Sequence, residues 1–250
     1  MDLSVGSRTE VGPRKMNQDC HGSWPELGLY VVADGMGGHN AGEVASHLAV
    51  ETIHDFIEES ARTADITWPF GLETKNSIDL NRLTTAVRLA NRKIYNEGSK
   101  APELSGMGTT VVAVLVAGDK LSIVSVGDSR LYRFRNGSLE QLTSDDTWLA
   151  SVLGAKEAED ADPGHPLRHV LTSVVGTKDD LKPESREEDL RSGDTFVLCT
   201  DGIHGRLDSA ALVSLLASAT TAADRADKLV SEAITRGTTD NATALVITVS

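Results

Sequence analysis

Short apolar runs rich in Val, Ile and Leu recur along the chain, and tight turns separate several of them. Gly118-Asp119-Lys120 stands between one neighbouring pair of runs, and Asn136-Gly137 stands between another. Asn-Gly between two such runs is the strongest short signal for a β-hairpin. The chain is therefore expected to build antiparallel sheet. The predicted strands cover residues 28–33, 110–117, 121–126, 131–135, 138–142, 195–200 and 243–249.

Helical periodicity fills the segments between these strands. Apolar residues recur at three- and four-residue spacing over 41–59 and 78–97, and two further helices are expected at 209–218 and 222–235. Strands joined by hairpins and helices in pairs predict an α+β fold with two stacked, mainly antiparallel β-sheets flanked by pairs of α-helices, an αββα sandwich. We expect one domain over residues 1–250, with a polar, irregular flap at about 146–168.

The charge balance excludes one class of partner. Lys and Arg number 24 and Asp and Glu number 37, which gives a net charge of −13. Because proteins bind nucleic acid through an excess of Lys and Arg, nucleic acid is not expected as the main partner. Solubility explains most of this charge, so only the positions of the carboxylates can indicate a metal site.

The cysteines and the N-terminus bear on chemistry and location. A catalytic cysteine of a phosphatase would be followed within a few residues by an Arg, whereas Cys199 is followed by Thr-Asp-Gly-Ile-His. Two cysteines, Cys20 and Cys199, are too few for a disulfide framework in a chain of this length. Without a basic-then-apolar leader or a run of ~18 apolar residues, we expect a cytoplasmic protein with no membrane contact.

Acidic residues stand where the predicted strands end. Asp34, Asp128 and Asp201 each follow a predicted strand closely, and Asp240 precedes the last one. One such Asp beside a Gly is usually a turn residue. Four at converging strand ends would form a like-charged cluster that needs cations, and oxygen ligands suit Mg²⁺ or Mn²⁺ rather than Zn²⁺. Two such ions activate a water for phosphoryl transfer, helped by an Arg for the phosphate and a His as proton donor.

Six short motifs occur in order between about residues 6 and 249. Together they resemble the ordered motifs of the protein phosphatase 2C family, the metal-dependent Ser/Thr protein phosphatases, and in particular its compact bacterial members. A run such as DGMGGH is expected by chance only about once in 10⁷ to 10⁸ windows. The motifs are Arg14-Lys15-Met16-Asn17-Gln18-Asp19, Asp34-Gly35-Met36-Gly37-Gly38-His39, Gly108-Thr109-Thr110, Val126-Gly127-Asp128-Ser129-Arg130, Thr200-Asp201-Gly202 and Thr239-Asp240-Asn241.

The resemblance implies a set of metal ligands. Asp34 is expected to bridge two metal ions, and Gly35 to offer its carbonyl oxygen. Asp201 and Asp240 are expected to hold the second ion, and Asp128 to help hold a third, weaker ion that shares Asp201. An alternative for Asp128 is a structural Asp bonded to the nearby turn.

The resemblance also implies three catalytic residues. Arg14 is expected to grip the substrate phosphate, Asp19 to orient metal-bound water, and His39 to act as the general acid. Arg14 as a plain surface charge and His39 as a helix-start residue without a catalytic role are the alternatives.

The implied activity is hydrolysis of phosphoserine and phosphothreonine by a water bridging two divalent metals, opposing a Ser/Thr kinase. The implied cofactors are two Mn²⁺ or Mg²⁺ ions per active site and a third, weaker site. We expect phosphoprotein substrates, a cognate Ser/Thr kinase system, no nucleic-acid or membrane partner, and a monomer. Alternatives are a phosphatase for one regulator of a sigma-factor pathway, a small phosphate ester hydrolase, and a binding module without catalysis. The last would be favoured by loss of Asp34, Asp201 or Asp240, and all three are present.

Four other polar residues are interpreted as structural. His165 and His169 have the spacing of a metal pair, but Pro166 argues against a helix there, so both are expected to be exposed flap residues. Asp145 and Asp146 are expected to form a solvated loop pair, with metal contact as the alternative.

Overall fold

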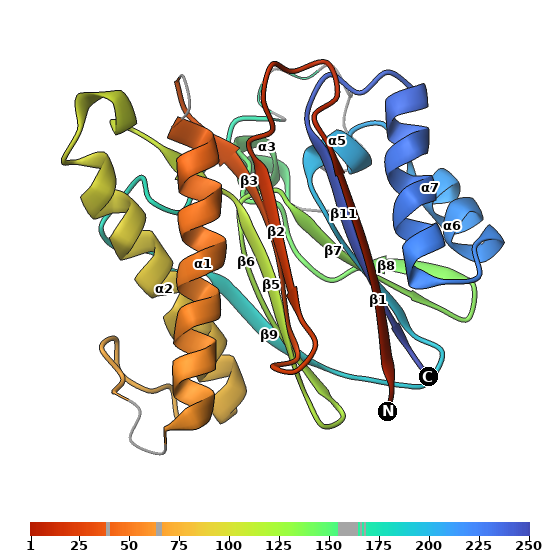
Figure 1. Cartoon of the computed structure of the whole chain (residues 1–250), viewed down its shortest axis with the longest axis horizontal. Helices are drawn as coiled ribbons and strands as arrows, with labels where there is room; N and C mark the ends of the chain where they lie inside the picture. Colours follow the sequence, from red (N-terminus) through yellow and green to blue (C-terminus); the bar gives the residue numbers. More distant parts are fainter. Residues whose placement is uncertain (39–40, 64–66, 155–164, 166, 168) are drawn as a thin grey trace.

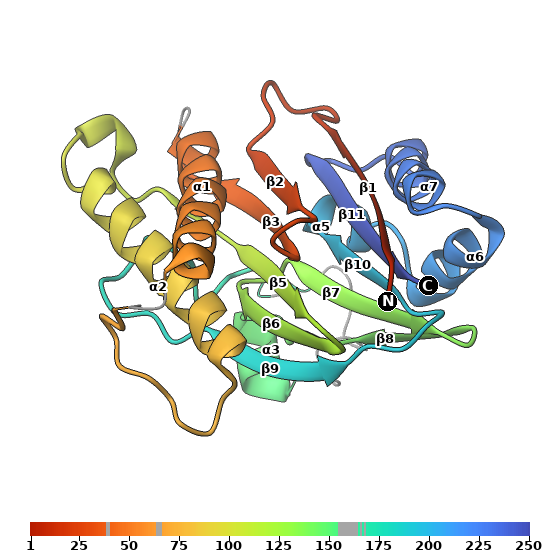
Figure 2. The same cartoon turned by 60° about the horizontal axis from the view of Figure 1, so that its bottom comes forward.

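The strands form two antiparallel sheets that lie face to face between two pairs of helices (Figure 1). The computed structural model describes residues 1–38, 41–63, 67–154, 165, 167 and 169–250. In these segments the layers run helix pair, sheet, sheet, helix pair, and the turned view in Figure 2 keeps that order. The predicted α+β sandwich is therefore confirmed.

The first sheet has the strand order β1–β11–β10–β7–β8, and each pairing is antiparallel. Asn136-Gly137 joins β7 to β8, and Asn136 has a φ of 52°, as the predicted hairpin turn requires. Leu3 lies opposite Val249, so the two ends of the chain are side by side. The strands are β1 (Leu3–Glu10), β7 (Arg130–Arg135), β8 (Ser138–Gln141), β10 (Thr195–Cys199) and β11 (Ala242–Val249).

The second sheet has the order β2–β3–β5–β6–β9, with the two-residue β4 paired to the end of β3. The β5–β6 hairpin turns at 118–119, as the sequence predicts. The strand β9 is polar, and it lies along the outer edge of β6 (Figure 2). The strands are β2 (Asp19–Trp24), β3 (Leu29–Met36), β4 (Gly108–Thr109), β5 (Val111–Ala117), β6 (Lys120–Val126) and β9 (Glu184–Asp189).

Two long helices cover the outer face of each sheet. The pair α1 (Ala41–Arg62) and α2 (Ile78–Gly98) packs on the second sheet, and the pair α6 (Ser209–Ser218) and α7 (Ala222–Thr235) packs on the first. The helices α2, α6 and α7 each begin at an N-cap whose side chain accepts a backbone N–H: Ser77, Asp208 and Thr221. Shorter helices are η1 (Pro102–Leu104), α3 (Trp148–Leu153) and α5 (Asp201–His204). No helix among the described residues is both long and apolar enough to cross a membrane.

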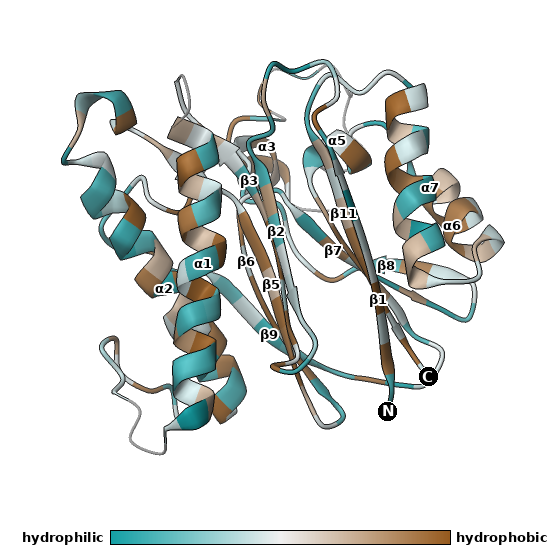
Figure 3. Cartoon of the chain, in the orientation of Figure 1, coloured by the Kyte–Doolittle hydropathy of each residue, from teal (hydrophilic) through white to brown (hydrophobic). Residues whose placement is uncertain are grey.

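Three apolar layers hold the sandwich together, one between the sheets and one under each helix pair. The strand β5 contributes to two of them, because Val112 and Val114 face the other sheet while Val111 and Ala113 face the helices. This explains why its sequence reads as an unbroken apolar run. In Figure 3 the central strands are mostly brown, whereas the helices carry teal segments.

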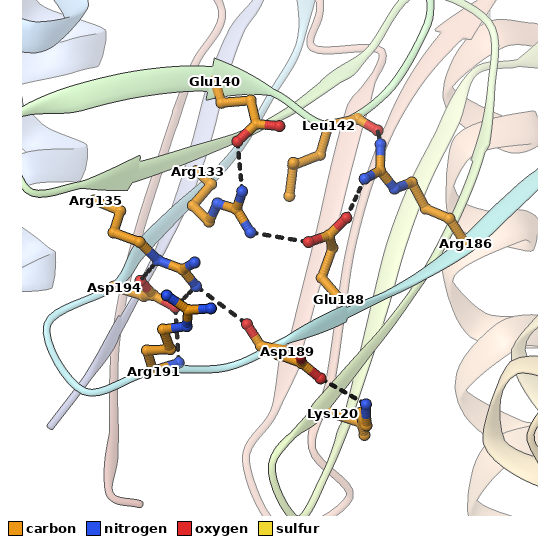
Figure 4. Close-up of polar contacts among 10 residues, drawn as sticks. All are labelled: Lys120, Arg133, Arg135, Glu140, Leu142, Arg186, Glu188, Asp189, Arg191 and Asp194. Atoms are coloured by element: carbon orange, nitrogen blue, oxygen red, sulfur yellow. Dashed lines mark hydrogen bonds and ion pairs between the residues drawn. The ribbon is translucent and has the colours of Figure 1, made fainter.

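A chain of ion pairs joins the two sheets at one edge (Figure 4). Arg133 on β7 donates to Glu140 on β8 and, at 2.9 Å, to Glu188 on β9 of the other sheet. Glu188 also binds Arg186. Close by, Arg135 binds Asp194, whose side chain is fully buried. Glu188 of β9 therefore makes a cross-sheet contact, although nothing apolar marks this strand.

Candidate active site

The acidic residues predicted at the strand ends do meet at one edge of the sandwich. In an antiparallel sheet the start of one strand lies beside the end of its neighbour. Asp19 opens β2 and lies directly opposite Asp34 near the end of β3. In the other sheet Asp201 follows β10, and Asp240 precedes the neighbouring strand β11. Asp128, after β6, completes the group.

Close backbone contacts bring these segments together. A Cβ placed on Gly202 would lie 1.9 Å from the carbonyl oxygen of Asn241, so only a glycine lets α5 pack against the segment that carries Asp240. A Cβ on Gly35 would lie 2.0 Å from the carbonyl oxygen of Gly42 in α1. Gly35 N–H also donates to Gln18 O at 3.0 Å, which fixes the two strand ends that carry Asp19 and Asp34.

The Gly-Thr-Thr motif holds the backbone of Asp34. Thr110 Oγ1 accepts from Asp34 N–H at 3.0 Å, and Thr110 N–H donates to Asp34 O at 2.8 Å. Thr109 Oγ1 donates to the same carbonyl oxygen at 2.9 Å. The Thr110 hydroxyl also bonds to Ser129 Oγ at 2.7 Å, which connects Asp34 to the turn of Asp128.

Asp19 is buried beneath the cluster, with 5 % of the residue exposed. Its Oδ2 accepts from Thr200 Oγ1 at 2.9 Å and from Thr243 Oγ1 at 2.6 Å, so it is tied to both strands next to Asp201 and Asp240. Its Oδ1 is buried and has no hydrogen-bond partner among the described residues. One oxygen thus positions the side chain, and the other remains available to a cation or to its water.

Asn241 fixes the loop that carries Arg14. Its Nδ2 donates to Val11 O and Met16 O, both at 2.9 Å, and its Oδ1 accepts from Gln18 N–H at 2.8 Å. The Arg14 guanidinium donates to Thr239 O at 3.0 Å and pairs with the Asp240 carboxylate. Its side chain is 53 % exposed, so the free part of the guanidinium faces solvent at the rim of the cluster.

Burial and mutual repulsion act on the carboxyl groups. Burial, and then the charge of Asp19, raise the pKa of Asp34 well above its usual value, and Asp201, Asp128 and Asp240 add to the rise. Burial raises the pKa of Asp19 to about 7, and burial with the charge of Asp201 raises the pKa of Asp128 to about 7. These carboxylates therefore share one electrostatic environment, and their charged forms need compensation.

The expectation of a solvated pair at Asp145 and Asp146 is wrong. Asp145 accepts two bonds from Arg130, at 2.9 and 2.7 Å, in a bidentate pair of which each side chain is less than a fifth exposed. Asp146 Oδ2 accepts from Gly127 N–H at 3.0 Å. Both residues therefore hold the Gly-Asp-Ser-Arg turn, Asp145 through Arg130 and Asp146 through Gly127 N–H, because carboxylates shielded from water need hydrogen-bond donors.

A cavity of about 330 Å³ opens beside Asp128 and Asp201. His204, at the end of α5, lines it, and its Nε2 lies 3.0 Å from the backbone oxygen of Asp128. Burial, and then the charge of Arg130, lower the pKa of His204 to about 3, so its imidazole is neutral at pH 7. His169 also lines the cavity, so this exposed residue lies beside the site.

The structure places most of the predicted site residues around this edge. His39 and about half of the predicted flap lie outside the described residues; of the flap at 146–168, residues 146–154, 165 and 167 are described. Seven predicted residues surround the cluster: Arg14, Asp19, Asp34, Gly35, Asp128, Asp201 and Asp240. The sequence alone indicated no role for Thr200, Thr243, Asn241, Arg130 or His204, whose contacts depend on strands distant in sequence.

The donor set fits divalent cations. Asp201 Oδ1, like Asp19 Oδ1, is buried without a hydrogen-bond partner in the described part of the chain. Oxygen-only ligands and several crowded carboxylates suit Mg²⁺ or Mn²⁺. In the described segments no three His, Cys, Asp or Glu side chains are already arranged as a ligand set, and Asp240 is paired with Arg14. Binding would therefore exchange that ion pair for a cation.

Known proteins share both the sequence and the fold of this chain. The sequence profile of protein phosphatase 2C matches residues 13–236. The chain is 31 % identical over 220 residues to "Serine/threonine phosphatase stp" of Listeria innocua, covering 88 % of this chain and 83 % of that protein. It is 34 % identical over 220 residues to "Serine/threonine protein phosphatase PstP" of Mycobacterium tuberculosis, covering 87 % of this chain and 40 % of that longer protein.

A solved structure agrees with these sequence matches. The catalytic domain of PstP in complex with two manganese ions superposes with a TM-score of 0.83 and 30 % identity, covering 99 % of both chains. The profile match covers most of this chain, and the same fold is present throughout it. The chain therefore belongs to the protein phosphatase 2C family.

Proposed function

We propose that this protein is a metal-dependent protein phosphatase that hydrolyses phosphoserine and phosphothreonine, with its active site at the edge formed by Asp19, Asp34, Asp201 and Asp240. The observation that carries the proposal is the convergence of these four carboxylates. Burial and neighbouring charges raise the pKa values of Asp19, Asp34 and Asp201, and buried oxygens of Asp19 and Asp201 have no hydrogen-bond partner among the described residues. Relatives named Ser/Thr phosphatases support the activity.

The proposed ligand roles are those that the family resemblance implies. Asp34, central among the carboxylates, is proposed to contact two cations, with the Gly35 carbonyl beside it. Asp201 and Asp240 would hold the second cation, and Asp128 with Asp201 would hold a third, weaker one. The PstP structure with two manganese ions supports two cations and Mn²⁺ as one of the metals that fit. Two bound divalent cations would supply an activated water and positive charge for the phosphoryl oxygens.

The reaction joins a water oxygen to phosphorus and breaks the phosphorus–oxygen bond to the Ser or Thr side chain. Asp19, held rigid by two threonine hydroxyls, orients the attacking water. Arg14 binds the substrate phosphate with the exposed part of its guanidinium, a geometry that suits phosphate oxygens. The leaving alkoxide takes a proton, and the family resemblance assigns that proton to His39.

Protein substrates suit the surroundings of the site. Asp146 holds the Asp128 turn, and α3 begins two residues after it, so α3 is proposed to contact part of a protein substrate. A Ser/Thr kinase must supply such phosphoproteins. The thiol alternative finds no support, because burial raises the pKa of Cys199 to about 12 and keeps it protonated.

The test is hydrolysis of p-nitrophenyl phosphate and a phosphothreonine peptide with Mn²⁺, Mg²⁺ or EDTA. We expect turnover with Mn²⁺ and none with EDTA. Asp34→Asn should lower turnover about a hundredfold or more, because charge stabilisation by metals contributes several kcal/mol. Asp119→Asn, on the exposed β5–β6 turn, is the matched control and should act like the parent. A folded parent inactive with every metal would leave only a binding role.

A further inference from the structure

We propose that His204 is a positioning residue that holds Asp128 at a fixed place relative to Asp201, and so sets the affinity of the site for a divalent cation between these two carboxylates. The inference rests on the proposed function, because it concerns the weaker cation of the same site. It assigns to His204 a role that the motif resemblance does not contain.

One hydrogen bond joins the His204 side chain to the backbone of Asp128. His204 Nε2 lies 3.0 Å from the backbone oxygen of Asp128. A carbonyl oxygen can only accept, so Nε2 carries the hydrogen and donates it. The proton on Nε2 is thereby committed to the backbone, and His204 does not act as a proton donor to the leaving group.

His204 and Asp201 belong to the same short helix. Asp201 opens α5 and His204 closes it, and Gly205 N–H donates back to Asp201 O at 2.8 Å. The residues between them, Gly202 and Ile203, are buried, and Gly202 packs tightly against Asn241. The His204 imidazole therefore lies on the same tightly packed helix, α5, as the Asp201 carboxylate.

Hydrogen bonds from three parts of the structure hold the turn that carries Asp128. Asp146 binds Gly127 N–H from the flap side, and Thr110 binds Ser129 from the side of Asp34. The bond from His204 is the contact that comes from the side of Asp201. Each of these hydrogen bonds thus sets the position of Asp128 relative to a different part of the site. The bond from His204 sets its position relative to Asp201, the carboxylate that would share its cation.

The polar side chains that line the cavity with His204 indicate that its imidazole positions Asp128 and does not only fill space. Arg130, Tyr132 and Asp145 form a bonded set on the same cavity wall, so these polar side chains already satisfy one another. The His204 ring is partly exposed to the cavity and makes its bond to Asp128 rather than to that set. Residues that orient metal ligands from behind typically change metal affinity by about 10- to 100-fold when replaced.

The test compares two amides at this position. In His204→Gln the amide nitrogen can reach the place of Nε2, whereas in His204→Asn it is too short, so only the first keeps the donor. Mn²⁺ binding is measured by calorimetry on metal-free protein, together with p-nitrophenyl phosphate turnover against Mn²⁺ concentration. His47→Asn, on an exposed face of α1, is the control and should match the parent.

We expect His204→Asn to weaken the lowest-affinity Mn²⁺ binding about tenfold or more while leaving tighter binding in place. Its turnover should recover at high Mn²⁺, and His204→Gln should behave like the parent. Equal isotherms for parent and His204→Asn would overturn the inference, as would a folded His204→Gln as weak as His204→Asn. Should His204→Asn melt at the assay temperature, His204→Leu replaces it. A parent that neither binds Mn²⁺ nor turns over would instead remove the proposed function.

Discussion

At the scale of single residues, the glycines after Asp34 and Asp201 are explained by crowding rather than by backbone conformation. Neither Gly35 nor Gly202 has a positive φ, unlike the turn glycine Gly137. Each instead lets an Asp-bearing segment approach another backbone more closely than any Cβ allows. The Asp-Gly pairs, which in sequence look like turns, are therefore packing contacts that set the spacing of the carboxylates.

Gly202→Ala is expected to damage both stability and catalysis. The new Cβ, 1.9 Å from Asn241 O, must push α5 away from the segment of Asp240. Overpacking of this kind costs about 1–3 kcal/mol, and a shift of about 1 Å in a catalytic group costs about a hundredfold in rate. Urea unfolding and phosphatase assays measure the two effects. Gly38→Ala is the control for stability, because beyond its chain neighbours no atom of the described residues lies within 4 Å of the new Cβ. Parent-like values for Gly202→Ala would contradict the packing role.

At the scale of elements, the apolar strands and long helices were predictable, because the positions they bury are occupied by apolar residues at the spacing of a strand or a helix. The helices at 209–218 and 222–235 match α6 and α7, and the strand at 243–249 lies within β11. The strands β1, β2 and β9 and the two-residue β4 were missed. The β9 sequence ESREED is largely exposed and is held by edge pairing with β6 and by ion pairs such as Arg133–Glu188, which no local pattern reveals. Most of the short helix α3 is likewise exposed.

The exposed face of α3 gives a prediction about substrate. Trp148 and Val152 lie one turn apart and are 50 % and 64 % exposed. Trp148 N–H donates to Val170 O at 2.8 Å, next to His169, which lines the cavity. Trp148→Ala should lower kcat/KM for a phosphoprotein about fivefold or more, as for a central aromatic contact, and leave p-nitrophenyl phosphate turnover unchanged. Tyr95→Ala removes a comparably exposed aromatic from α2 and is the control. An equal loss on both substrates would show that α3 supports the fold rather than binding protein.

At the scale of the whole molecule, the site was predictable where strand ends coincide with motifs. Asp34, Asp128, Asp201 and Asp240 could be grouped because each borders a recognisable strand. The residues that position them could not, because their contacts join distant parts of the chain. The clearest cases are the threonines on Asp19, from β11 and from the residue after β10, and His204 on Asp128. The partner of a buried polar atom is decided by the packing of both sheets.

The same packing couples the stability of the metal-free protein to pH. The pKa of Asp128 is raised from 3.8 to about 7, so the folded state favours the neutral carboxyl. The stabilisation is complete below about pH 4 and is lost as pH rises to about 7, because the unfolded state then releases its proton more readily. A pKa that differs by one between the folded and unfolded states corresponds to about 1.4 kcal/mol of stability. A bound cation reverses this trend, since it requires the charged form.

In EDTA, the melting temperature of the parent relative to Asp128→Asn should therefore fall between about pH 5 and about pH 7.5, since the amide cannot titrate. Added Mn²⁺ should raise the parent's melting temperature more at the higher pH, where binding displaces fewer protons. Asp119→Asn, far from the cluster on an exposed turn, should follow the parent in both series. Parallel curves for the parent and Asp128→Asn in EDTA would mean that neither burial nor the charge of Asp201 raises the pKa of Asp128, which would contradict its place in the cluster.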